Sequence, residues 1–159
     1  MKFTIAGIGK IQKKWIKEGI QEYQKRMTPV VKVQILEQEE EKMPPHGSEA
    51  MKESILQKEG QKILKYVHST DCVILLDVAG KEMSSPALAK WLEEQMNGGN
   101  SSFVFLLGGP FGNGKNLKER ADFMLSLSPM TFPHQLARLI LMEQLYRAVK
   151  IIRNEPYHL

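Results

Sequence analysis

The sequence has few of the residues that build disulfides and metal sites. Its 159 residues include one cysteine, Cys72, which excludes a disulfide framework and a cysteine-based zinc cluster. The segment around Cys72, DCVILLD, is apolar and predicts a buried, inert thiol. The four histidines, at positions 46, 68, 134 and 158, lack the spacing of metal ligands, so we expect no metal. No G-x-S-x-G turn presents a nucleophilic serine.

Long apolar runs are also missing. No stretch approaches the roughly 20 apolar residues of a membrane-spanning helix. The opening MKFTIAGIG is too short for a secretory signal and predicts a strand. We therefore expect a cytoplasmic protein without a membrane segment. The composition, 42% hydrophobic and 25% charged, is typical of a globular protein, and the length predicts a single domain over residues 1–159.

The charge is modestly positive and unevenly distributed. The chain carries a net charge of +4, and the segment from Lys10 to Arg26 holds six basic residues against Glu18 and Glu22. This segment is either a solvated helix face or a surface for nucleic-acid phosphates, which attract clustered Lys and Arg. The acidic run EQEEEK at 37–42 predicts a solvated loop.

Apolar runs alternate with helical patterns along the chain. Strands are expected over 2–8, 30–37, 71–80, 101–109 and 122–128, and helices over 12–27, 48–67, 84–96, 115–121 and 133–153. Trp15 falls on the apolar side of the first helix by its spacing, and Ser85 and Pro86 are expected as N-cap and first residue of the third. This alternation predicts an α/β fold with a mostly parallel sheet flanked by helices.

Three loops follow strands at the edge where such sheets bind ligands, namely 75–80, 106–112 and 125–132. We expect them to converge on one site. The glycines of LLGGPFG allow close approach of a ligand to the backbone, and LSLSPMTFPH supplies hydroxyls, amides and apolar groups. Together these features suit a ligand such as an adenosine.

The last helix is apolar on nearly every side. Its apolar residues fall into two opposite groups: Leu136, Ile140 and Ile151, and Met142, Leu145 and Val149. Such a helix needs burial on more than one face. We expect the sheet to cover one face and a second subunit the other, in a homodimer. The alternative is a helix covered by loops of its own chain.

The stretch FVFLLGGPFGNGKN is close to a phosphate-binding P-loop. Gly109, Gly114 and Lys115 have the spacing of G-x-x-x-x-G-K-[ST], but Asn116 replaces the hydroxyl that would bind magnesium. Pro110 also removes an N–H donor, and the motif follows the fourth strand rather than the first. Nucleoside triphosphate hydrolysis is therefore disfavoured.

The turn AGIGKIQ offers a second nucleotide-binding pattern. Gly7 and Gly9 follow the first strand as in a Rossmann fold, and Glu37 ends the second strand. Gln12, however, occupies the position of the third glycine. A tight turn without a ligand is the favoured interpretation.

Taken together, the segments FLLGGPFG, ILLDVAGKEMSSPALA and LSLSPMTFPHQLARLILMEQLYRAVKIIRNEPYH resemble the SPOUT (α/β-knot) methyltransferases. The chain is similar in particular to the ribosomal large-subunit pseudouridine N3-methyltransferase family, over essentially its whole length. The resemblance implies a C-terminal trefoil knot, although knots are otherwise rare. Leu159 departs from the basic residue on which relatives commonly end.

The resemblance also implies S-adenosylmethionine as cofactor, bent into the knot, and a homodimer whose partner subunit completes each site. It implies methyl transfer to N3 of a pseudouridine in 23S rRNA of the large subunit or the assembled ribosome. The cofactor-binding residues implied by the resemblance are Leu76, Gly108, Leu127, Ser128, Pro129, Met130, Thr131 and Phe132.

The catalytic candidates are His158, Tyr157, Arg147 and His134. The imidazole of His158 could accept the N3 proton, Tyr157 could contact the base, and Arg147 could stabilise the developing imidate or hold a phosphate. Each has a structural alternative: His134 as a helix cap, Arg147 in a surface ion pair with Glu143, and the last four residues as a frayed tail. Two rival functions are a non-catalytic RNA-binding factor on a knotted scaffold and a SPOUT enzyme acting on tRNA.

Overall fold

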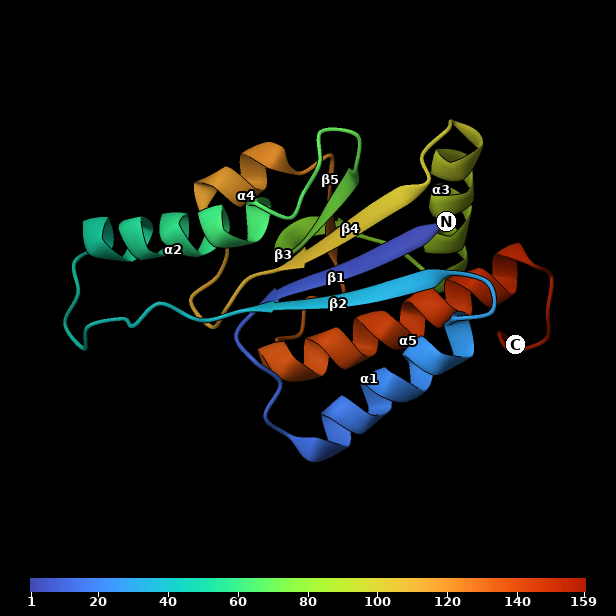
Figure 1. The fold of residues 1–159 in the computed structure, drawn as a ribbon, viewed down its shortest axis with the longest axis horizontal. Coiled ribbons are helices and arrows are strands. Elements are labelled where there is room, and N and C mark those ends of the chain that lie inside the picture. The colour runs from blue at the N-terminus through green and yellow to red at the C-terminus, as the bar shows by residue number, and fades with distance from the viewer.

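A five-stranded parallel sheet forms the centre of the computed structural model, which describes residues 1–159 (Figure 1). The strands are β1 (Lys2–Ile8), β2 (Lys32–Gln38), β3 (Cys72–Glu82), β4 (Ser102–Leu107) and β5 (Phe123–Ser126). Their order is β2-β1-β4-β3-β5, and every neighbouring pair is parallel. The sequence-based prediction of an α/β fold with a mostly parallel sheet is confirmed.

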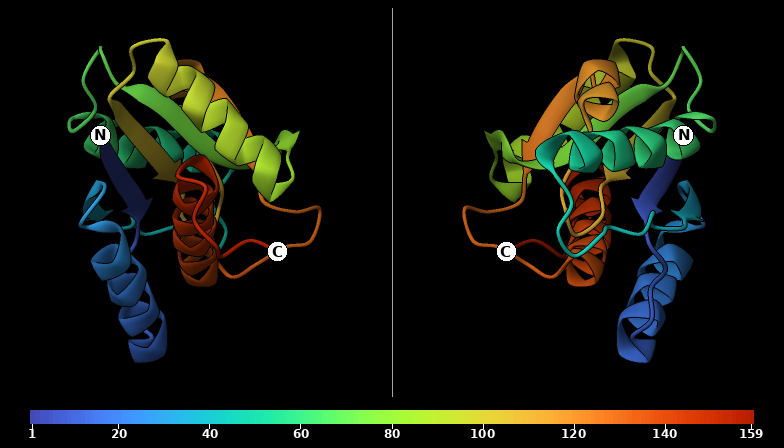
Figure 2. Two further views of the ribbon diagram at one scale, coloured as in Figure 1. Left: turned by 90° about the vertical axis from the view of Figure 1, so that its right-hand side faces the viewer. Right: turned by 90° about the vertical axis from the view of Figure 1, so that its left-hand side faces the viewer.

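Helices cover both faces of the sheet. They are α1 (Lys14–Met27), α2 (Glu49–Leu64), α3 (Ser85–Asn97), α4 (Lys115–Arg120) and α5 (His134–Ile152). Helices α1, α3 and α5 pack on one face, and α2 and α4 pack on the other (Figures 1 and 2). None of these helices combines the length and the apolar character needed to cross a membrane.

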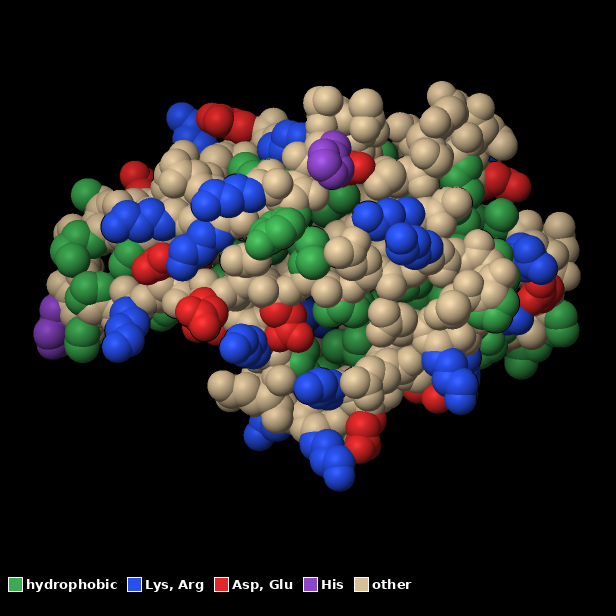
Figure 3. Space-filling view, in the orientation of Figure 1, with side chains coloured by type: hydrophobic (Ala, Val, Ile, Leu, Met, Phe, Trp, Pro, Cys, Tyr) green, Lys and Arg blue, Asp and Glu red, His purple; other side chains and the backbone are tan.

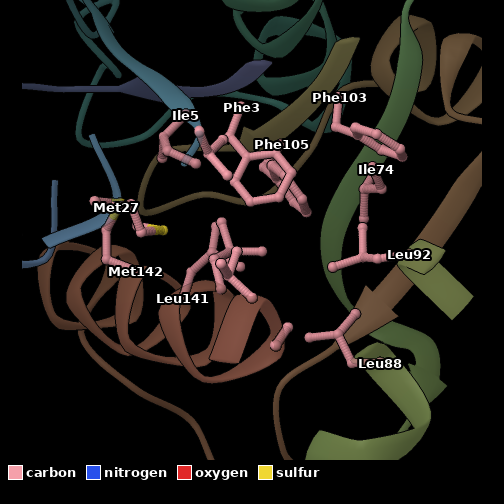
Figure 4. Packing of buried hydrophobic residues seen from close by; sticks show 14 of the residues in the cluster. Phe3, Ile5, Met27, Ile74, Leu88, Leu92, Phe103, Phe105, Leu141 and Met142 are labelled. Atoms are coloured by element: carbon pink, nitrogen blue, oxygen red, sulfur yellow. The ribbon is translucent and has the colours of Figure 1, made fainter. Parts of the chain in front are cut away.

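The larger part of the core lies under α1, α3 and α5. Phe3 of β1 meets Phe103 and Phe105 of β4 edge to face, with ring centroids 5.9 and 5.6 Å apart. Leu141 of α5 packs in the same cluster (Figure 4). Burial of each such side chain stabilises the fold by about 1.5–3 kcal/mol. Cys72 is buried, as expected, and burial raises the pKa of its thiol.

Helix α1 differs from the prediction at its start. It begins at Lys14 rather than residue 12, and no side chain of its own caps it. Instead, Oε1 of Gln135 in α5 accepts hydrogen bonds from the backbone N–H groups of Gln12 (2.9 Å) and Lys13 (3.3 Å). Trp15, expected on the apolar side, is 58% exposed, because the buried face is centred on Ile16 and Ile20.

Two further local predictions are corrected. The N-cap of α3 is Ser84, whose Oγ accepts from the N–H of Ala87, while the hydroxyl of Ser85 donates to Gln144 of α5. The acidic run is not a simple solvated loop, because Glu37 and Gln38 belong to β2 and Glu41 pairs with Lys62 of α2 at 2.6 Å.

Strand β3 is interrupted where it lies beside β5. It pairs with β5 over Ile74–Leu76 and again over Lys81–Glu82, and the residues between leave the ladder as a loop. A side chain at Gly80 would come within 2.7 Å of backbone atoms of Met124 and Leu125, so the close approach requires glycine. This loop is held at the carboxyl edge of the sheet. The trefoil knot implied by the resemblance stays a prediction.

Candidate active site

Three loops meet at the carboxyl ends of β3, β4 and β5 and enclose a hollow. Its volume is about 410 Å³, within the range of small-molecule pockets. The lining is mixed apolar and polar, and comprises Leu76, Asp77, Val78, Leu107, Gly108, Gly109, Pro110, Gly112, Asn113, Phe132, Pro133, His134 and Ala137. The convergence expected of the three loops is therefore present in the fold.

A second hollow of about 140 Å³ adjoins the first and shares Leu76 and Phe132 with it. The predicted cofactor residues that line this second hollow are Leu127, Ser128, Met130 and Thr131. The structure thus brings seven of the eight predicted cofactor residues to two connected hollows. Pro129 lines neither of them.

Asn113 holds the glycine loop against the end of β3. Its Nδ2 donates to the carbonyl of Leu76 and to Oδ2 of Asp77, both at 2.9 Å. Its Oδ1 is buried and has no partner. A Cβ at Gly108 would lie 2.3 Å from this Oδ1, so only glycine fits there. The orphaned acceptor suits a ligand that carries an amino or hydroxyl donor.

Sequence reasoning missed Asn113 as a site residue. It placed Asp77 within the loop 75–80 without assigning it a role. The available signal was that Asp77 follows the apolar run CVILL and that Asn113 lies one residue beyond the loop 106–112, both at the binding edge. No three side chains among the His, Cys, Asp and Glu residues come together in a group that could hold a metal ion.

The first turns of α5 form another wall of the site. His134 lines the larger hollow, and one turn later Arg138 is buried, with its side chain 3% exposed. Nη2 of Arg138 donates to the carbonyl of Ile8 at 2.5 Å, whereas Nε and Nη1 have no hydrogen-bond partner. Nη1 lies 4.0 Å from Oε2 of Glu37, and burial lowers the pKa of the guanidinium.

The turn AGIG accommodates this arginine. A Cβ at Gly7 would lie 2.4 Å from Cζ of Arg138, and a Cβ at Gly9 would lie 2.5 Å from a carboxylate oxygen of Glu40. Gly9 also has a positive φ of 89°. The glycines that suggest a nucleotide-binding turn make room for the side chains of buried Arg138 and exposed Glu40.

The surroundings of His134 favour the neutral form of its imidazole. Burial and then the charge of Arg138 lower its pKa, and Glu40, 3.9 Å from its Nε2, opposes them. A neutral ring keeps one nitrogen free to accept a proton or a hydrogen bond. The alternative role of His134 as a helix cap is wrong, because Pro133 occupies the N-cap and no side chain caps α5.

The other three catalytic candidates form a cluster at the far end of α5. Oε1 of Glu143 accepts from Arg147 Nη2 at 2.6 Å and from the hydroxyl of Tyr157 at 3.1 Å. The Arg147 guanidinium lies 4.7 Å from the Tyr157 ring centroid, and its Nη1 lies 3.2 Å from Nδ1 of His158. Burial and the nearby Glu143 raise the pKa of Tyr157 to about 12, so this phenol stays protonated.

The structure contains one of the structural alternatives and contradicts another. Arg147 forms the expected ion pair with Glu143 at 2.6 Å, within a network in which Tyr157 also meets Tyr146 edge to face at 4.8 Å. The segment ending the chain is therefore docked on α5 up to His158 rather than frayed.

Within one chain, the cluster around Arg147 lies far from the hollow. His134 and Arg147 are 13 positions apart on α5, which corresponds to about 20 Å at 1.5 Å per residue. The C-terminus accordingly lies at the end of α5 remote from the glycine loop (Figure 1). One chain brings together His134 and the predicted cofactor residues, but not Arg147, Tyr157 and His158.

The end of the P-loop pattern makes contacts within the chain. Lys115 begins the short helix α4, with its side chain 86% exposed and 3.7 Å from Glu119. Asn116 donates to the backbone carbonyl of Gln57 in α2, which ties α4 to α2. These contacts give the end of the motif a structural role and agree with the rejection of triphosphate chemistry.

The fold is an α/β sheet with a hollow among the loops at its carboxyl edge, the edge at which such sheets commonly bind small ligands. A family model described as "Predicted SPOUT methyltransferase" matches residues 1–158. The chain belongs to the SPOUT methyltransferase family and is a methyltransferase, as the sequence resemblance had indicated.

Curated relatives match over nearly the full length. Proteins named "Ribosomal RNA large subunit methyltransferase H" from Carboxydothermus hydrogenoformans and Acetivibrio thermocellus are each 46% identical over 158 residues, 99% of both chains. A protein from Methanococcus maripaludis, named "Putative ribosomal RNA large subunit methyltransferase H", is 45% identical over the same share.

Proposed function

We propose that this methyltransferase transfers a methyl group from S-adenosylmethionine to N3 of a pseudouridine in 23S rRNA, in the large subunit or the assembled ribosome. The observation that carries the proposal is the 46% identity over 99% of both chains to proteins named as large-subunit rRNA methyltransferases. The hollow at the carboxyl edge of the sheet supplies the place for a methyl donor.

The loops around the two hollows would hold the donor. Leu76, Phe132 and the segment Leu127–Thr131 offer apolar surface and backbone groups for the adenosine, and the free Oδ1 of Asn113 offers an acceptor for an amino or hydroxyl group. Gly108 allows the backbone to approach closely. When bound, the donor supplies a methyl group activated on a positively charged sulfur.

The acceptor nitrogen must lose a proton during the transfer. N3 of pseudouridine is an imide nitrogen, and its negative charge develops as the proton leaves, so a nearby cation lowers the barrier. We assign this electrostatic role to Arg147, which Glu143 and Tyr157 hold in a fixed orientation. Tyr157 acts as a hydrogen-bond donor or stacking partner, because its raised pKa rules out a role as base at neutral pH. The candidate proton acceptors are His134 and His158.

A homodimer would bring the cluster around Arg147 close to the hollow lined by His134. The cluster around Arg147 is about 20 Å along α5 from His134, so we propose that the C-terminal segment of a second copy completes each site. The half-buried apolar residues Leu136, Ile140 and Ile151 of α5 support a subunit interface, because they retain exposed apolar surface in the single chain.

The decisive experiment supplies labelled S-adenosylmethionine with separate substrates from cells that lack the protein: ribosomes, isolated subunits, free rRNA and tRNA. We expect label in the large-subunit rRNA, and nucleoside analysis should identify N3-methylpseudouridine. Label in tRNA alone would favour the tRNA enzyme. Absence of donor binding by calorimetry, with RNA binding retained, would favour the non-catalytic factor.

A further inference from the structure

Trp15 is an exposed tryptophan that the fold does not need. Its side chain is 58% exposed on the first turn of α1, where Ile16 makes the core contact instead. The other tryptophan, Trp91, is partly buried and stacks on Phe123 with ring centroids 4.7 Å apart. A large aromatic side chain left in water at this position is available for a partner.

Lysines surround Trp15 in the sequence and on the surface. Lys13 and Lys17 make no ion pair, and the pairs of Lys10 with Glu39 (4.0 Å) and Lys14 with Glu18 (3.8 Å) are long and exposed. Exposed pairs of this kind contribute little and leave the positive charge available. Figure 3 shows Lys and Arg side chains gathered over the start of α1, at the bottom of the view.

The start of α1 lies close to the donor site. Gln135, which accepts from the N–H groups of Gln12 and Lys13, directly follows His134, a residue of the larger hollow. The two residues before α1 are therefore in direct contact with the first turn of α5, which lines the hollow. Trp15 follows Lys13 by two positions.

We infer that Trp15 and the lysines at positions 10, 13, 14 and 17 form a stacking surface for an unpaired RNA nucleotide next to the methylated one. The inference rests on the proposed function. Single-stranded RNA is recognised by bases stacked on aromatic rings, with Lys or Arg beside the phosphates. The combination of an exposed indole with flanking cations matches both requirements.

A second copy of the chain fits this surface less well. Cores of protein interfaces are depleted of lysine, whereas four lysines lie within five positions of Trp15. The excess of four positive charges between Lys10 and Arg26 favours a polyanion. Both the stacking surface and the charge point to RNA.

The test measures binding of a short single-stranded oligouridylate by fluorescence. The Trp91→Phe variant keeps the aromatic contact with Phe123 and leaves Trp15 as the sole tryptophan, so stacking on Trp15 should quench its emission. In the otherwise unchanged chain, Trp15→Ala should weaken binding about 5- to 100-fold, and Trp15→Phe should restore most of it. Replacing Lys13 or Lys17 with Gln should reduce the salt slope of log K by about 0.7 each.

Tyr66→Ala is the matched control, because Tyr66 is also an exposed aromatic residue that follows a lysine, but it lies at the end of α2. It should leave oligouridylate binding unchanged. Unchanged binding by Trp15→Ala, or equal losses in the two variants, would overturn the inference. So would a loss of dimer mass in Trp15→Ala, which would assign the surface to a second copy.

The proposed function has a separate readout. If Trp15→Ala binds RNA like the unchanged protein while the unchanged protein still methylates ribosomes, the stacking surface is wrong and the function stands. If the unchanged protein methylates no RNA, the proposed function fails whatever the result for Trp15.

Discussion

Adding one methyl group at Gly108 should block the proposed methyl-donor site without unfolding the protein. A Cβ at this position would lie 2.3 Å from Oδ1 of Asn113 and 2.5 Å from the backbone oxygen of Gly112. Ordinary contact between such atoms requires about 3.5 Å, so the loop must move by about 1 Å. The Gly112 oxygen belongs to the backbone and cannot rotate away as a side chain can.

The size of the effect follows from the contacts of Asn113. Its displacement strains the hydrogen bonds to the carbonyl of Leu76 and the carboxylate of Asp77. Losing a neutral and a charge-assisted hydrogen bond of this kind costs about 2–4 kcal/mol in total. If the donor needs the loop in its present position, Gly108→Ala should bind S-adenosylmethionine about 30- to 1,000-fold more weakly.

Calorimetry with S-adenosylmethionine measures the affinity, and urea unfolding checks that the variant is folded. Gly98→Ala is the matched control, because a Cβ at Gly98, in the C-cap of α3, would meet only ordinary contacts at 3.4 Å. Gly98→Ala should bind the donor like the unchanged protein. Unchanged affinity in Gly108→Ala, with normal stability, would refute the assignment of the glycine loop to the donor.

Three further predictions concern α5. Because burial and Arg138 lower the pKa of His134, its unfolded form takes up a proton at higher pH, so stability should rise with pH just below the unfolded pKa of about 6.5. His134→Gln should flatten that rise in urea midpoints, and an unchanged slope would contradict the shift. Arg147→Lys loses the two-nitrogen contact with Glu143, so methyl transfer should fall about 10²- to 10³-fold at unchanged donor affinity; a fall in donor affinity instead would place Arg147 at the donor. Ile140→Asp should convert a dimer to a monomer in light scattering, whereas a stable dimer would exclude this face of α5 as the interface.

Much of the fold follows from local sequence patterns. Continuous apolar strands such as CVILL and SFVFLL predict a sheet buried on both faces, and the structure has such a sheet. The ends of helices were less predictable. Ser84 and Ser85 are equivalent as caps in the sequence, and the choice depends on Gln144, which is far away in the chain.

The sequence could predict which loops form the site, but not which side chains contact one another within it. The three strand ends indicate where the ligand binds, because parallel strands share one carboxyl edge. The partners of Asn113 and Arg138 are tertiary, since Arg138 reaches the carbonyl of Ile8 across 130 positions of the chain. The exposure of Trp15 was missed because helical periodicity places it only one position from the buried Ile16.

The shared amide of Gln135 has a consequence for cooperativity. Its side chain holds Gln12 and Lys13, directly before α1, and comes from the turn of α5 that carries His134, so the two helix starts cannot shift independently without breaking its hydrogen bonds. If RNA bound at α1 disturbs the hydrogen bonds of Gln135, the free energy of RNA binding becomes coupled to the free energy of methyl-donor binding. Thermodynamic linkage then requires reciprocity: whatever factor the donor adds to RNA affinity, RNA must add to donor affinity.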